Sequence, residues 1–182
     1  MRGEGKGDGR RAADRIGSTR RLQGTGRTLT PMQDSVTVTM DATPEAVWAL
    51  VSDVTRIGEF SPETFEAEWL DGATGPAVGA RFRGHVKRNG KGPIYWSECT
   101  VTVCEPRTEF TFDVMTGGKV VNTWGYRLRA TDAGTEVTEF FHLAENPLTR
   151  IYWTLAGWAR GKTNRDGMRR TLEAMQAVLE PK

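Results

Sequence analysis

The sequence predicts an α+β domain in which a curved, seven-stranded antiparallel sheet wraps around one long C-terminal helix. Two observations predict this fold. From about residue 64 to 143 polar and apolar side chains alternate, and turn-forming residues interrupt the alternation at short intervals. Residues 147–179 instead carry apolar side chains at helical spacing. An antiparallel sheet must cover one apolar face, and this helix is the only predicted element long enough to do so.

The overall composition is that of an ordinary soluble domain. The chain has 182 residues, of which 37% are hydrophobic and 26% charged, and its net charge is +2. This length predicts one domain, or two at most. No run approaches the roughly 18 consecutive apolar residues that a membrane-spanning helix needs. Two cysteines exclude a disulfide scaffold, and two histidines leave little for a histidine-rich metal site.

Residues 1–33 differ from the rest and are expected to form a disordered basic tail before a domain at 34–182. They hold eight Lys or Arg against three Asp or Glu, a net charge of +5, while residues 34–182 have a net charge of −3. The tail has no aromatic residue and no apolar period, so it cannot bury enough surface to offset its ordering entropy. Translation from Met32, which would leave the tail unmade, is one interpretation, and binding of nucleic acid through its arginines is the least favoured.

The domain is expected to begin with a strand and two short helices. Residues 35–40 alternate polar and apolar side chains, which predicts a half-buried strand. Thr43 can cap the helix that follows, Pro44 suits its first position, and Glu45 suits the positive end of the helix dipole. Asp53 begins a second short helical segment.

Six further strands are predicted, and short turns between them indicate antiparallel hairpins. Their expected ranges are 65–70, 80–87, 94–104, 109–115, 120–130 and 135–143. In the final helix, Gly157, Gly161 and Gly167 each cost roughly 1 kcal/mol relative to alanine, so a kink or break is expected there. The Gly157–Gly161 region is the expected gate of any cavity beneath the helix.

The hairpin turns predict a pairing register, and all the registers agree on one buried face. Tyr126 is expected opposite Glu139, Phe112 opposite Trp124, and Val103 opposite Phe110. A slip of one residue would move a whole strand's side chains to the other face. This face is mostly aromatic and aliphatic with a few polar groups, as in a small-molecule pocket; a packed core with satisfied polar groups is the alternative. The predicted ligand-binding residues are Tyr95, Ser97, Phe110, Phe112, Asn122, Trp124, Tyr126, Glu139, Phe141, Ile151 and Leu155.

The sequence offers few groups for catalysis. Glu139, Tyr126 and His142 are weak acid/base candidates, and His142 is expected near the pocket rim. Cys99 and Cys104 are expected on opposite faces of one strand, roughly 16 Å apart and beyond disulfide reach. Two free thiols favour the reducing cytoplasm. No ligand-type spacing predicts a metal, and no phosphate-binding motif in the domain predicts a cofactor.

Three segments carry a family resemblance. They are Ser35-Val36-Thr37-Val38 with Ala42-Thr43-Pro44-Glu45-Ala46-Val47-Trp48, Val78-Gly79-Ala80-Arg81-Phe82-Arg83-Gly84, and Gly134-Thr135-Glu136-Val137-Thr138-Glu139. Together with the order of elements, they resemble the START/pollen-allergen-like (SRPBCC) superfamily and its polyketide cyclase/dehydrase-like branch. The resemblance covers about residues 34–180. It implies a helix-grip fold with a cavity for a hydrophobic or aromatic molecule, but no catalytic motif that could be carried over.

Three functions remain open, because this fold does not fix a function. The leading interpretation is binding of a small hydrophobic or aromatic molecule in a cavity between the sheet and the C-terminal helix. The alternative is a polyketide aromatase/cyclase-type enzyme, in which Glu139, His142 or Tyr126 transfers protons. The third is a protein-interaction module that uses the aromatic residues at 148–158.

Overall fold

The computed structural model describes residues 33–87, 92–144 and 147–180, and within 147–162 it describes the backbone alone. The expected basic tail therefore lies outside the described residues, apart from Gln33, where the first strand begins. The elements follow in the order β1 (Gln33–Met40), α1 (Pro44–Val51), the 3-10 helix η1 (Val54–Glu59), β2 (Thr64–Trp69), β3 (Arg81–Lys87), β4 (Ile94–Glu105), β5 (Glu109–Thr116), β6 (Lys119–Thr131), β7 (Gly134–Leu143) and α2 (Pro147–Leu179).

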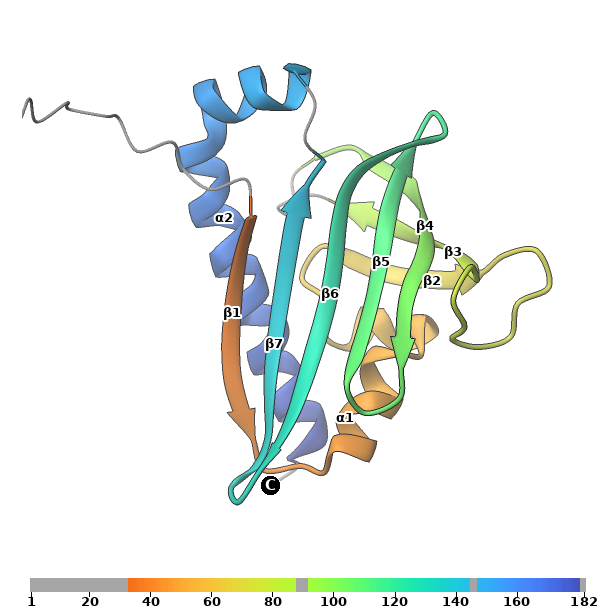
Figure 1. Cartoon of the computed structure of the whole chain (residues 1–182), viewed down its shortest axis with the longest axis vertical. Coiled ribbons are helices and arrows are strands. Elements are labelled where there is room, and N and C mark those ends of the chain that lie inside the picture. Colours follow the sequence, from red (N-terminus) through yellow and green to blue (C-terminus); the bar gives the residue numbers. More distant parts are fainter. Residues whose placement is uncertain (1–32, 88–91, 145–146, 181–182) are drawn as a thin grey trace, which may run out of the picture.

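The seven strands form one antiparallel sheet in the order β1-β7-β6-β5-β4-β3-β2. This confirms the predicted α+β architecture with two short helical segments after the first strand. In Figure 1, α2 is one continuous helix that changes direction in its first half and then runs along β1 and β7. Since α2 packs mainly against β1 and β7, it leaves the inner face of the other strands free of this helix.

Local sequence chemistry accounts for the two short helical segments. The hydroxyl of Thr43 accepts a hydrogen bond of 3.2 Å from the backbone N–H of Ala46, and Pro44 occupies the first helical position of α1. The Asp53 carboxylate caps η1 in the same way, accepting from the N–H of Thr55 at 3.1 Å. The predicted cap at Thr43 and the predicted helical start at Asp53 are thus confirmed.

The turn between β6 and β7 requires glycine at position 134. Gly134 has a φ of +110°, and a Cβ built there would lie 2.1 Å from the carbonyl oxygen of Met40. The next residue, Thr135, is fully buried and donates a 2.7 Å hydrogen bond to the carbonyl of Ala42. This contact fixes the end of β1 against the start of β7, next to the helix α1.

Most of the predicted cross-strand pairs are confirmed. Tyr126 lies opposite Glu139 in the β6–β7 ladder, and Phe112 lies opposite Trp124 in the β5–β6 ladder. Alternation along each strand then brings their side chains to the same concave face. On the convex face the neighbouring positions form exposed ion pairs, such as Arg129 with Glu136 at 2.7 Å.

One predicted pairing, that of Val103 with Phe110, is wrong. A bulge between Val101 and Val103 shifts the register, and Phe110 instead pairs with Cys104. Cys104 therefore packs partly buried against the core on the same face as Cys99, and not on the opposite face. The extra residue of a bulge reverses the alternation beyond it, which a simple count from the turn cannot reveal.

The hydrophobic core lies where α1 and the second half of α2 meet the inner face of the sheet. Its largest fully buried side chains include Phe82, Phe110, Phe141, Met168, Leu172 and Met175. Among the helices in the described part of the chain, none combines the length and the apolarity needed to cross a membrane.

Candidate functional site

Beside this core, the inner face of the sheet encloses a cavity of about 510 Å³. Its walls come from strands β3 to β7, from the segment between η1 and β2, and from one face of α2. The size is within the usual range for small-molecule pockets. The position follows from the fold, because a helix that lies along β1 and β7 does not fill the concavity of the remaining strands.

The structure brings seven of the eleven predicted ligand-binding residues to this cavity. They are Tyr95, Ser97, Phe112, Asn122, Trp124, Tyr126 and Glu139. Two others, Ile151 and Leu155, lie in the part of α2 whose side chains are not described.

Phe110 and Phe141 are on the predicted face but do not line the cavity. Both are almost completely buried in the core. The ring of Phe110 meets Trp48 of α1 edge-on, with centroids 6.2 Å apart, and Phe141 lies 5.2 Å from Trp124. Helix α1 and the ring of Trp124 thus separate the two phenylalanines from the cavity, so their expected role as ligand contacts is corrected to a packing role.

His142 does not belong to the site either. Alternation along β7 turns Glu139 and Phe141 inward, and Phe140 and His142 outward. The imidazole is exposed and lies against the ring of Phe140, with centroids 5.5 Å apart. Its expected position near the pocket rim, and with it an acid/base role inside the cavity, is therefore wrong.

The polar centre of the cavity is a pair of side chains on adjacent strands. The hydroxyl of Tyr126 on β6 donates a hydrogen bond of 3.3 Å to Oε1 of Glu139 on β7. Glu139 is only 5% exposed, and its Oε2 has no hydrogen-bond partner within the described part of the chain. Burial raises the pKa of this carboxyl to about 8, although the hydrogen bond from Tyr126 opposes the shift. Burial also raises the pKa of Tyr126, and the nearby Glu139 charge adds to the effect.

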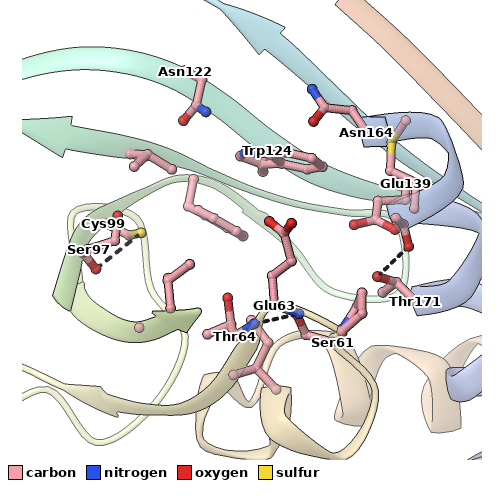
Figure 2. A pocket seen from close by; sticks show the side chains of 18 of the residues that line it. Ser61, Glu63, Thr64, Ser97, Cys99, Asn122, Trp124, Glu139, Asn164 and Thr171 are labelled. Atoms are coloured by element: carbon pink, nitrogen blue, oxygen red, sulfur yellow. Dashed lines mark hydrogen bonds between the residues drawn. The ribbon is translucent and has the colours of Figure 1, made fainter. Parts of the chain in front are cut away.

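A second unpartnered polar atom lies further along β6. Asn122, Trp124 and Tyr126 are at alternate positions of that strand and all line the cavity. The side-chain oxygen Oδ1 of Asn122 is buried and, among the described residues, has no hydrogen-bond partner. Figure 2 shows the indole of Trp124 between Asn122 and Glu139. Two unpartnered polar side chains thus flank one aromatic ring.

The opposite wall is formed by residues that were not predicted from the sequence, which indicated Ile151 and Leu155 of α2 instead. They include Asn164, Gly167, Met168 and Thr171 of α2, Ser61 to Glu63 of the segment before β2, and Thr64 at the start of β2. Positions 164, 168 and 171 have the helical spacing of a single face, and this spacing could have indicated the α2 wall. The segment before β2 carries no comparable signal, since its position depends on the tertiary fold alone.

Cys99 lines the cavity but is poorly suited to act as a nucleophile. Burial raises the pKa of its thiol to about 12, and the negative charges of Asp113 and Glu98 add to the shift. Its Sγ donates a weak hydrogen bond of 3.9 Å to the carbonyl of Ser97. Across the residues that the structure describes, no three His, Cys, Asp or Glu side chains are grouped as metal ligands.

A curved sheet that holds a long C-terminal helix beside an internal cavity defines the helix-grip class of proteins. Within that class, the chain belongs to the polyketide cyclase/dehydrase and lipid transport family, whose profile matches residues 33–180. This assignment agrees with the resemblance carried by the sequence segments at 35–48, 78–84 and 134–139. No curated protein gives a significant match to the sequence.

Several solved structures are similar to this chain. The polyketide-cyclase-like protein Cgl2372 from Corynebacterium glutamicum is 28% identical, with a TM-score of 0.54 over 83% of this chain and 93% of that one. Protein MLL2253 from Mesorhizobium loti is 17% identical, with a TM-score of 0.58 over 81% and 96% of the two chains. The di-domain ARO/CYC protein StfQ of the steffimycin biosynthetic pathway is 10% identical, with a TM-score of 0.62 over 82% of this chain and 50% of its own. At such low identities, the last two comparisons support the fold alone.

Proposed function

We propose that this protein binds a small hydrophobic or aromatic molecule in the cavity between the sheet and α2. The observation that carries the proposal is a cavity of about 510 Å³ in which buried polar atoms of Asn122 and Glu139 have no partner among the described residues. In a filled core such atoms find partners, because leaving one unsatisfied costs about 1–3 kcal/mol. A ligand that supplied the missing hydrogen bonds would remove this cost.

The walls of the cavity suit an apolar or aromatic ligand. Phe112 and Trp124 offer aromatic surface on the side of the sheet, and Met168 offers apolar surface on the side of α2. Tyr95 is 38% exposed and also lines the cavity, which places it where a ligand would meet solvent. Most of the binding free energy is expected from the apolar area removed from water, and the polar atoms are expected to orient the ligand.

Filling the cavity tests this proposal directly. A Cβ built at Gly167 meets no atom within 4 Å, so Gly167→Leu would place its side chain in the cavity without displacing the helix. The matched control is Ala177→Leu, which introduces the same leucine side chain at an exposed position of the same helix. The probe is N-phenyl-1-naphthylamine, whose fluorescence rises in apolar surroundings.

We expect the original protein and Ala177→Leu to bind the probe equally, and Gly167→Leu to bind it at least about tenfold more weakly. Circular dichroism would establish that all three proteins are folded. Equal binding by the three proteins, or no binding of this and other apolar aromatic probes by the original protein, would refute the proposed function.

A second candidate function is acid/base catalysis of the polyketide cyclase type. One observation favours it: the pKa of Glu139, raised by burial to about 8, lies near neutral pH, where a carboxyl can both accept and donate a proton. The test is deuterium exchange at the central carbon of 1-phenyl-1,3-butanedione, followed by NMR. Catalysis predicts exchange above the buffer rate that Glu139→Gln abolishes; a rate equal to that of buffer would exclude this chemistry for such a substrate.

We also propose a cytoplasmic location. Cys99 and Cys104 are both free thiols, as expected in a reducing compartment.

A further inference from the structure

The charged side chains on the cavity walls limit which ligands can bind. Its described lining includes the carboxylates of Glu63 and Glu139, and no Lys, Arg or His. The arginines of the neighbouring strands project from the opposite face of the sheet, where they are already paired. Arg83 on β3 bonds Glu68, for example, and Arg127 on β6 bonds Glu109 at 2.8 Å. Among the described walls a ligand carboxylate would therefore find no positive partner, and burying an unpaired carboxylate is costly.

Oδ1 of Asn122 is a hydrogen-bond acceptor, and Oε2 of Glu139 becomes one when its carboxyl is ionised; within the described part of the chain neither atom has a partner. A ligand group that donates hydrogen bonds would satisfy both atoms once Glu139 is ionised. A hydroxyl carries one donor hydrogen, whereas an ammonium carries up to three and no acceptor. The ammonium also supplies the positive charge that a buried carboxylate needs to be stable.

The aromatic lining favours the same group. The indole of Trp124 lies between Asn122 and Glu139, and the rings of Tyr126 and Phe112 line the same cavity (Figure 2). The faces of such rings attract cations within about 6 Å, most strongly when the site is shielded from water. Indole attracts cations most strongly among these rings, and here it lies between Asn122 and Glu139.

We infer that the ligand is an apolar amine, whose protonated nitrogen binds Glu139 and Asn122 while its aromatic or aliphatic body packs against Trp124 and Phe112. The inference rests on the proposed function, since it names the chemical class that the cavity takes. It distinguishes this pocket from one for fatty acids or other carboxylates, for which the described walls offer no positive charge.

Binding of an amine should release a proton from Glu139. In the described part of the cavity, the titratable groups besides Glu139 are Tyr126 from β6, Glu63 from the segment before β2, and Tyr95 and Cys99 from β4. The described side chains of α2 in the cavity, such as Asn164 and Thr171, carry no charge. With a pKa of about 8, Glu139 is mostly neutral at pH 7 in the empty cavity. A bound ammonium stabilises the carboxylate, so about one proton passes from Glu139 to solvent per ligand bound. Affinity for the amine should therefore rise by up to about tenfold per pH unit from pH 6 to 7.5.

The experiment compares three probes that share one ring system: 1-naphthylmethylamine, 1-naphthylmethanol and 1-naphthoic acid. Each is titrated calorimetrically into the full chain at pH 6, 6.5, 7 and 7.5, and at pH 7 in two buffers of different ionisation enthalpy. We expect the amine to bind at least about tenfold more tightly than the alcohol at pH 7, with release of about one proton, and the acid more weakly than both. Affinity for the alcohol should show little change with pH.

Two variants test whether Glu139 and Asn122 account for the preference for the amine. Glu139→Gln keeps the shape of the side chain but cannot carry the charge, so it should abolish both the preference for the amine and its pH dependence. Asn122→Leu should weaken binding of the amine by a smaller factor, and the affinity of this variant should still depend on pH. Should Glu139→Gln fail to fold, the release of a proton by the original protein still decides the question.

The outcomes separate the two proposals. Alcohol binding that Gly167→Leu abolishes, combined with no preference for the amine, would overturn the amine inference and leave the proposed function standing. Tight binding of the acid would likewise refute the inference alone. No binding of any of the three probes would count against both.

Discussion

The hydroxyl of Tyr126 lies 3.3 Å from Oε1 of Glu139, between two strands whose register places these residues directly opposite each other. The second carboxylate oxygen has no partner in the described part of the molecule. One neutral hydrogen bond replaces only part of the hydration that a carboxylate loses on burial. The pair is therefore stable mainly when Glu139 holds its proton. The stability of the protein should consequently depend on pH.

The first prediction concerns the pH dependence of stability. The pKa of Glu139 is about 8 in the folded protein against an ordinary value of 4.5, so the folded state binds the proton more tightly than the unfolded state. The stabilisation due to this proton is complete below about pH 4.5 and is lost as the pH rises through 8. Relative to Glu139→Gln, which stays neutral, the original protein should lose up to about 1.4 kcal/mol of unfolding free energy per pH unit between these values.

Urea unfolding at pH 5, 6.5 and 8 would measure this difference. The control is Glu136→Gln on the same strand, which removes an exposed ion pair with Arg129 and should change stability by about 0–1 kcal/mol. Parallel curves for the original protein and Glu139→Gln across this range would show that Glu139 is not a buried proton site.

The second prediction separates the effect of the hydrogen bond from that of burial. The hydrogen bond from Tyr126 lowers the pKa of Glu139 and so opposes the effect of burial. Tyr126→Phe should therefore raise the pKa of Glu139 further, at a cost of about 1 kcal/mol in stability. The measurement is the carboxyl ¹³C chemical shift of Glu139 as a function of pH. A lower midpoint in Tyr126→Phe would mean that the tyrosine does not stabilise the carboxylate.

The sequence predicted the polar centre of this site for a physical reason. Alternation and short turns determine which side chains of a hairpin face inward, so Asn122, Trp124, Tyr126 and Glu139 could be placed on one face without a structure. The same reasoning could not separate cavity from core. Phe110 has the same orientation as these residues, but α1 packs over it, and the position of a helix across a sheet is decided by tertiary packing.

Two other errors have local causes. The bulge between Val101 and Val103 has no glycine to indicate it, so the register beyond it was misjudged and Cys104 was assigned to the wrong face. Asn164 and Thr171 of the α2 wall were not predicted, because the polar residues expected in the site all came from the sheet and α2 was expected to contribute the apolar Ile151 and Leu155.

The third prediction concerns the two thiols, which the bulge brings to one face of β4. Burial raises the pKa of Cys99 to about 12, and it also raises that of Cys104, but Cys104 is only partly buried. Alkylation requires the thiolate and access of the reagent. Iodoacetamide at pH 8 should therefore modify Cys104 well before Cys99. Trypsin leaves both cysteines in one peptide, residues 92–107, so fragmentation of this peptide by tandem mass spectrometry would measure which one is modified. Cys104→Ala should then be almost unreactive while folded, and rapid labelling of Cys99 in that variant would contradict its burial.

The last prediction concerns Gly167, the glycine that α2 carries beside the cavity. Glycine within a helix costs up to about 1 kcal/mol relative to alanine, and a Cβ at Gly167 would meet no atom within 4 Å. Gly167→Ala should therefore stabilise the protein by up to about 1 kcal/mol in urea unfolding, while its methyl group takes space from the ligand. Affinity for N-phenyl-1-naphthylamine should fall by a smaller factor than in Gly167→Leu. Arg169→Ala, at an exposed position of α2, is the control and should change neither property appreciably. A destabilised Gly167→Ala would show that the space beside the helix is already filled, whereas a gain in stability with a loss of affinity would mean that the glycine keeps the cavity open at the expense of the helix.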